Sequence, residues 1–251
     1  MTPLVQRIDE FLVNRRKERD ISYKAYAQQR GYRFPPYLAG KCTRRAVYTL
    51  LGFPEPDMTP GALRIIENGN SMQERYQAWL KDAGLLLHKE YPVSSDELLI
   101  SGRCDGILLI DRKLYVLELK TTGLFNFQEM ARTKQPDPEY KDQLMLYMHL
   151  TEIPNGIILV EGIITDRGKV QAPPDDPEAG FYMSEHLLEF HVSYDPEHAG
   201  RLVEKVKRIN ACVAQGLLPE RDYPLNSKPC RFCPFRERCW FLDPDIGRPC
   251  R

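Results

Sequence analysis

The stretch GRCDGILLIDRKLYVLELK, residues 102–120, contains two short apolar segments with turn residues between them. The segments predict consecutive β-strands that form a hairpin. Asp105 stands at the start of the first strand, and Glu118, Leu119 and Lys120 end the second. Because side chains alternate along a strand, Glu118 and Lys120 share one face while Leu119 turns into the core. A hairpin of this kind brings Asp105 beside Glu118.

Helical and strand patterns surround this hairpin on both sides. Further strands are expected at LLLHKEYPV (85–93), GIILVEGII (156–164) and EHLLEFHVSYD (185–195). Helices are expected over 3–29, from about 42 to 52, and over 61–83, 138–151 and 196–215, with a proline-rich loop over 171–180. Strands clustered between helices predict an α/β fold with a central mixed β-sheet flanked by helices.

The bulk composition is that of an ordinary globular protein. The 35 basic and 35 acidic residues give a formal net charge of zero, which argues against binding of nucleic acid through bulk charge but leaves room for a local basic groove. No apolar run approaches the roughly 20 residues that cross a bilayer, and the polar start is no signal peptide. We therefore expect a cytoplasmic protein with no membrane partner.

Two carboxylates and a lysine in this pattern suggest a particular chemistry. Asp105 and Glu118 together offer an oxygen-rich site for Mg²⁺ or Mn²⁺. Such an ion generates hydroxide from bound water and neutralises charge on a scissile phosphate, and Lys120 is placed to orient that water or to stabilise the transition state. The alternative is that Glu118 and Lys120 form a solvated cross-strand face with Asp105 in a turn. The spacing alone favours that alternative.

With its downstream helix, the pattern resembles the RecB-like branch of the PD-(D/E)XK nucleases. In that family an Asp precedes an E-x-K strand by a hairpin, small polar residues follow the lysine as Thr121 and Thr122 do, and Q-x3-Y lies on a later helix. Gln143 and Tyr147 match this last motif and lie one turn apart on one helix face. Without the resemblance they would describe an amphipathic helix with a half-buried tyrosine.

The resemblance implies a restriction-endonuclease-like core and a metal-dependent DNA exonuclease that acts on single-stranded DNA or DNA ends. Asp105, Glu118 and the Leu119 carbonyl would bind Mg²⁺ or Mn²⁺, and Lys120 would assist the attacking water. Gln143 and Tyr147 would position the DNA strand or the lysine.

The chain departs from the family pattern at one metal ligand. The family commonly carries a histidine in G-x3-H-E on the helix before the sheet, whereas GNSMQERYQAWL places Gln73 at that position with Glu74 beside it. An amide binds a metal more weakly than imidazole does, and only through its carbonyl oxygen. Either Glu74 takes the role, Gln73 does so weakly, or a metal position is partly lost. The departure keeps open a catalytically weak or inactive DNA-binding or adaptor protein.

Three of the seven cysteines, Cys230, Cys233 and Cys239, form C-x2-C-x5-C near the end of the chain. A reducing cytosol opposes disulfides, so the spacing indicates a metal or cluster site. In RecB-like nucleases with an iron–sulfur cluster a fourth cysteine lies upstream of the core, where Cys42 matches. The resemblance therefore implies a [4Fe-4S] cluster held by these four residues. Coordination chemistry alone leaves zinc and the cluster about even. We expect the remaining cysteines to be non-ligands: Cys104, Cys212 and Cys250.

The resemblance also implies an organisation and partners. We expect one compact unit made of a helical region over 1–60 that contributes Cys42, a nuclease core over 61–195, and a C-terminal helix and cysteine-cluster region over 196–251. The chain most resembles the Cas-four exonucleases of CRISPR adaptation and their phage relatives. A CRISPR integrase or a helicase of recombination would then be the protein partner.

Overall fold

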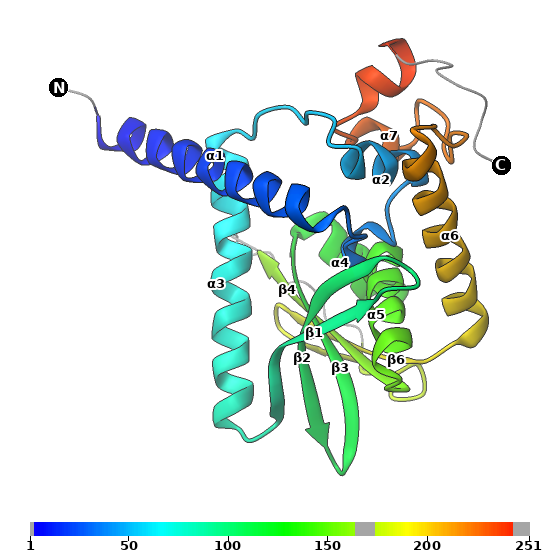
Figure 1. Ribbon diagram of the computed structural model, residues 1–251. Helices are drawn as coiled ribbons and strands as arrows, with labels where there is room; N and C mark the ends of the chain where they lie inside the picture. The colour runs from blue at the N-terminus through cyan, green and yellow to red at the C-terminus, as the bar shows by residue number, and fades with distance from the viewer. Residues whose placement is uncertain (1–2, 164–173, 243–251) are drawn as a thin grey trace.

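A six-stranded mixed β-sheet forms the centre of the protein in a computed structural model that describes residues 3–163 and 174–242, with the backbone alone described over 22–30 (Figure 1). The strand order is β1-β2-β3-β4-β6-β5, in which β3 and β4 are parallel and the other neighbours are antiparallel. The strands are β1 Leu86–Ser95, β2 Ile100–Ile110, β3 Lys113–Gly123, β4 Asn155–Ile163, β5 Phe181–Ser184 and β6 Leu187–Ser193.

Helices cover both faces of this sheet. The helix α3 lies along one face, and α5 and α6 lie on the other, while α2 and the last helices gather at one end (Figure 1). Within the described residues no helix has the length and apolar character needed to cross a membrane. The helices are α1 Leu4–Arg30, α2 Thr43–Leu50, α3 Pro60–Asp82, α4 Leu124–Thr133, α5 Pro138–Thr151, α6 Pro196–Gln215, α7 Lys228–Arg231, and the short turns η1 Pro36–Leu38 and η2 Arg238–Leu242.

The expected α/β architecture with a mixed sheet is confirmed, and α5 and α6 begin and end at the residues predicted from the sequence. Besides the short helices α7, η1 and η2, the helix α4 and the strand β5 were not predicted. The helix α4 begins after Gly123 without a side-chain cap, so it carries no start signal. The strand β5 has four residues, too few for a period, and forms by pairing with β6. Residues 171–173 of the expected loop and Cys250 lie outside the described residues.

The core is divided by the sheet into two apolar clusters. The smaller one packs Met72 of α3 against Leu117 and Leu119 of β3 and Ile157 of β4. The larger one joins the other sheet face to α5, α6 and α2 and extends to Phe235 beyond α7. Helix α3 and helix α5 are therefore fixed on opposite sides of β3, which carries the E-x-K residues.

A close backbone contact at Gly40 joins the segment before α2 to the start of α5. A Cβ atom at Gly40 would lie 2.5 Å from the Cα atom of Glu139 and 2.8 Å from its carbonyl oxygen. We expect Gly40→Ala to lower the free energy of unfolding by about 1–3 kcal/mol because the helix backbone has to move. Urea unfolding measures this. Gly200→Ala on α6, where a Cβ meets nothing within 4 Å, is the control and should be neutral or stabilising.

Candidate active site

The strands β2 and β3 separate at the residues that carry the motif. Their ladder runs from Ile110 and Lys113 to Gly106 and Leu117 and does not continue beyond them. At the next position the Asp105 side chain replaces the strand-to-strand backbone contact. Its Oδ2 accepts a hydrogen bond of 2.6 Å from the backbone N–H of Leu119. The hairpin therefore sets the Asp105 carboxylate against the end of β3, between α3 and α5.

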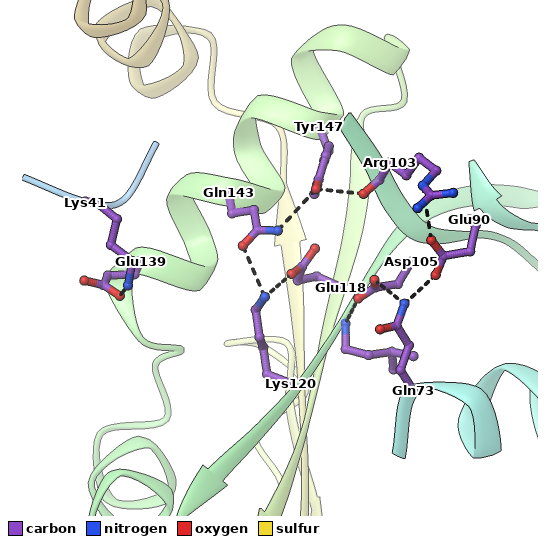
Figure 2. A network of polar contacts seen from close by, with 11 residues as sticks. Lys41, Gln73, Glu90, Arg103, Asp105, Glu118, Lys120, Glu139, Gln143 and Tyr147 are labelled. Atoms are coloured by element: carbon purple, nitrogen blue, oxygen red, sulfur yellow. Dashed lines mark hydrogen bonds and ion pairs between the residues drawn. The ribbon is translucent and has the colours of Figure 1, made fainter. Parts of the chain in front are cut away.

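A chain of polar contacts runs from Glu118 to β2 across α5 (Figure 2). Lys120 forms an ion pair with Glu118 Oε1 and donates a hydrogen bond of 3.1 Å to Gln143 Oε1. Gln143 Nε2 donates to the Tyr147 hydroxyl at 3.2 Å, and that hydroxyl donates to the Arg103 carbonyl at 2.8 Å. The Q-x3-Y residues thus connect the lysine of one strand to the backbone of its neighbour.

Burial excludes the solvated-face alternative. Glu118 is only 1% exposed and Tyr147 only 4%, so neither belongs to a polar surface of the sheet or of α5. The alternative interpretation of Tyr147 as a half-buried tyrosine of an amphipathic helix is likewise excluded. These side chains form a buried polar network, which is stable only when its members are paired.

A second group of contacts joins α3 to the carboxylates. Gln73 Nε2 donates to Asp105 Oδ1 at 2.9 Å and also to Glu90 Oε1, so one amide bridges two carboxylates (Figure 2). Gln77 Nε2 donates to the same Glu90 oxygen at 3.0 Å and to the Asp105 carbonyl at 2.8 Å. Glu74 is exposed, and among the described contacts none joins it to Asp105. Gln73, which the sequence pattern places at the position of the family histidine, therefore acts in this structure as a hydrogen-bond donor.

The electrostatics of the site follow from the burial of these charges. Burial raises the pKa of Asp105 well above its ordinary value, and the neighbouring charge of Glu118 raises it further. Burial also raises the pKa of Glu118, although the Lys120 ammonium opposes this effect. For Lys120 burial acts to lower the pKa, but Glu118 and Asp105 outweigh it and the pKa is raised. The lysine stays cationic beside carboxylates that hold protons more tightly than usual.

One oxygen of this network fits a divalent cation. Glu118 Oε2 is buried without a hydrogen-bond partner among the described residues, which is costly for a carboxylate unless a cation satisfies it. Hard oxygen donors are what Mg²⁺ and Mn²⁺ prefer, and Asp105 provides further oxygens nearby. Across 3–163 and 174–242 no three His, Cys, Asp or Glu side chains converge on one point, so a bound ion would draw its other ligands from backbone carbonyls or water.

The Tyr147 hydroxyl carries a measurable share of stability. We expect Tyr147→Phe to lower the free energy of unfolding by about 1–2 kcal/mol, because the Arg103 carbonyl and the Gln143 amide lose their shared partner in a buried place. Chemical denaturation measures the change. Tyr182→Phe, on the partly exposed strand β5, should change the value by less than about 0.5 kcal/mol.

The raised pKa of Asp105 predicts that metal binding releases protons. Below its raised pKa, the Asp105 carboxyl of the folded protein is protonated, and this proton competes with the metal. The competition ends as the pH rises through the raised pKa. Because a metal needs the ionised carboxylate, the affinity for Mn²⁺ should rise with pH over the same interval. Calorimetric titration in two buffers of different ionisation enthalpy counts the protons. Asp105→Asn should release fewer, and equal release by both proteins would contradict the assignment.

The four cysteines proposed as cluster ligands line one cavity, but within the described residues no three of them form a group that could hold a metal ion. Cys42 lies just before α2, while Cys230, Cys233 and Cys239 come from α7, the following turn and η2. None forms a disulfide, and Arg44 Nη1 lies 3.6 Å from the Cys239 sulfur. Burial raises the pKa of Cys42 to about 11. Cys104 and Cys212 are fully buried in the larger apolar cluster, away from this cavity.

Comparison with known proteins agrees with the geometry. A family model described as the PD-(D/E)XK nuclease superfamily matches residues 61–240, and the chain belongs to this superfamily. A search of curated proteins finds no significant match.

Two solved structures share this fold at low sequence identity, and a third is less similar. The protein SSO0001 is 16% identical, with a TM-score of 0.50 over 91% of this chain and 94% of that one. A phage related exonuclease from Haemophilus somnus 129PT is 15% identical, with a TM-score of 0.52 over 73% of this chain and 94% of that one. An alkaline exonuclease from Laribacter hongkongensis gives 16%, a TM-score of 0.45, and coverage of 71% and 90%.

Three residues of the site were not predicted from the sequence: Glu90, Gln77 and Arg103. Glu90 lies in an apolar strand after a register shift between Leu86 and His88, and its φ of 50° departs from strand geometry. The simple alternation of a strand does not place it. Gln77 lies four residues after Gln73, so helix spacing was the signal for its position. Arg103 lies two residues before Asp105 and shares its strand face, which was the available signal there.

Proposed function

We propose that the protein is a metal-dependent DNA exonuclease that hydrolyses phosphodiester bonds in single-stranded DNA or at DNA ends, with Mg²⁺ or Mn²⁺. The observation that carries this proposal is the buried group of Asp105, Glu118 and Lys120, in which one Glu118 oxygen has no hydrogen-bond partner in the part of the chain that the structure describes. Membership of the nuclease superfamily supports the reaction class. The choice of exonuclease rests on the phage related exonuclease that shares the fold.

In this mechanism Asp105, Glu118 and the Leu119 carbonyl would hold the ion. When bound, the ion lowers the pKa of a coordinated water and neutralises phosphate charge. Lys120 is held by Glu118 and Gln143, so its ammonium is fixed in orientation. From there it stabilises negative charge that develops as water attacks phosphorus and the bond to the leaving oxygen breaks. Gln143 and Tyr147 position the lysine by connecting it through hydrogen bonds to the backbone of β2.

The test is cleavage of an end-labelled single strand with Mn²⁺. Wild-type protein should shorten the strand progressively, and EDTA, Glu118→Ala and Lys120→Ala should each stop it. A circular single strand of the same sequence separates end-dependent from internal cutting. If the wild type never cuts faster than the two variants, the nuclease proposal fails.

A second candidate is a DNA-binding or adaptor protein that has kept the nuclease fold without cutting. The position of Gln73 favours it, because an amide N–H₂ faces Asp105 where the family has a metal ligand. Gln73→His separates the two candidates. In the adaptor case the added imidazole should create Mn²⁺ binding and cleavage that the wild type lacks. In the nuclease case the wild type already cuts, and the change tunes an existing rate.

We further propose that Cys42, Cys230, Cys233 and Cys239 hold a [4Fe-4S] cluster. The common cavity supports this, as do Arg44, Arg45 and Arg236 on its wall, which would offset the negative charge of four thiolates. Anaerobic purification tests it. A brown protein with broad visible absorbance and bound iron is expected, whereas a colourless protein with stoichiometric zinc would replace the cluster by a structural zinc site.

We infer the biological partner from the resemblance to Cas-four exonucleases and their phage relatives. A CRISPR integrase or a helicase of recombination is the expected partner in that case. Copurification of the tagged protein from its native cell, with products identified by mass spectrometry, tests this expectation. If neither an integrase nor a helicase copurifies, the expectation of such a partner is wrong.

A further inference from the structure

The site contains two cations with different access to solvent. Lys120 is largely enclosed, since its side chain is 24% exposed and contacts Glu118 and Gln143. Arg103 is 66% exposed, although it lies two residues from Asp105 on the same strand. An incoming phosphate group can therefore meet the Arg103 guanidinium before it reaches the lysine.

The backbone of Arg103 accepts a short hydrogen bond, while its side chain has one long ion pair among the described residues. The carbonyl of Arg103 accepts the hydrogen bond from the Tyr147 hydroxyl at 2.8 Å. The side chain pairs with Glu90 Oε2 at 3.5 Å, the longer end of ion-pair distances, and reaches out from β2 toward that residue (Figure 2). Exposed pairs of this kind contribute little stability, so exchange of the partner is easy.

Glu90 does not depend on Arg103 for its own place in the structure. Its other oxygen, Oε1, already accepts hydrogen bonds from the amides of Gln73 and Gln77. The carboxylate therefore remains satisfied when the guanidinium leaves. This asymmetry makes Glu90 a temporary counter-ion that keeps Arg103 beside the site.

The charge of the site indicates why an exposed cation would be needed for DNA binding. Three carboxylates (Glu90, Asp105 and Glu118) face two cations (Lys120 and Arg103), so the network carries a net charge of −1 when all five groups are ionised and no metal is bound. A DNA phosphate approaching such a site is repelled unless an exposed cation meets it. Arginine binds phosphate through two parallel N–H donors, which fixes orientation as well as charge.

We propose that Arg103 binds a backbone phosphate of the DNA strand that enters the site, leaving Glu90 as it does so. The assignment rests on the proposed nuclease function. It makes Arg103 a substrate-binding residue and Glu90 its competitor for the guanidinium. The bound phosphate would lie beside Asp105, which is where the scissile bond has to be positioned.

The test is binding of a fluorescent single strand in EDTA, so that affinity is measured without cleavage, over a series of salt concentrations. Arg103→Ala should weaken binding roughly tenfold. It should also reduce the slope of log K against log salt by about 0.7, the value for loss of one single-strand phosphate contact. Glu90→Gln should tighten binding severalfold, because the competing carboxylate is gone. Lys113→Ala, at the exposed start of β3, is the matched control for loss of one positive charge.

The outcomes separate this inference from the function on which it rests. If wild type binds DNA and Arg103→Ala has the slope of Lys113→Ala, the inference is overturned while the nuclease proposal stands. If Arg103→Ala and Glu90→Gln both weaken binding and both lower the melting temperature, the two residues form a structural pair and the inference also fails. If wild type binds no DNA in EDTA or with Mn²⁺, the proposed function itself fails.

Discussion

Lys120→Ala is expected to lower the rate of DNA cleavage by on the order of 10³-fold, which corresponds to ~4 kcal/mol of transition-state stabilisation. The lysine is the cation in direct contact with Glu118, and its pKa is raised, so it keeps its charge at any pH at which cleavage would be measured. No neighbouring side chain in the described network replaces it, because Gln143 is neutral and the contacts of the Arg103 side chain are with Glu90 and, as proposed above, with a DNA phosphate rather than with Glu118. Single-turnover cleavage with saturating Mn²⁺ measures the effect.

The control has to separate lost chemistry from lost structure. Removing Lys120 leaves Glu118 buried without its counter-ion, and that carboxyl is expected to take up a proton rather than unfold the core. Thermal unfolding in EDTA and cleavage by Lys113→Ala, a change on the same strand, test for general damage. A folded Lys120→Ala protein that retains more than about a tenth of the wild-type rate would contradict the role assigned to the lysine.

The central hairpin and its reactive residues were predictable because their information is local. Strand alternation and the turn residues lie within 102–120, and they place Asp105 beside the end of the E-x-K strand. The helix with Gln143 and Tyr147 was predictable for the same reason, since its period and its proline start lie in one segment. What each of these side chains contacts depends on the packing of α5 against β3, which the local pattern does not specify.

The other half of the site is made by contacts between distant segments. Gln73 and Glu90 are 17 residues apart and meet because α3 packs on the sheet while the register shift in β1 turns the glutamate toward the helix. No residue pattern in either segment encodes that meeting. The sequence pattern predicted Gln73 at the position of a family histidine, but the orientation of its N–H₂ group follows from Glu90 and Asp105, the two carboxylates that accept its hydrogen bonds.

Cys233→Ser is expected to remove the bound iron and to lower the melting temperature by roughly 10 °C, which corresponds to ~3–5 kcal/mol for a structural metal centre. The proposed ligands come from segments almost 200 residues apart, Cys42 and the region around Cys239, so loss of one ligand disconnects the two ends. Visible absorbance, iron content and thermal unfolding are measured on protein purified without oxygen. Cys212→Ala is the matched control, because Cys212 is buried in the apolar cluster and outside the cavity.

Cys233→Ser should also affect the catalytic site. Lys41, which precedes the proposed ligand Cys42, forms an ion pair with Glu139, and Glu139 lies one turn before Gln143 on α5 (Figure 2). A cluster that fixes Cys42 therefore also fixes the start of α5, the helix from which Gln143 contacts Lys120. Cys233→Ser should accordingly slow cleavage more than Cys212→Ala does, even if both variants lose equal stability. Equal rates in the two variants, with iron lost only from Cys233→Ser, would show that the cysteine region and the nuclease centre act independently.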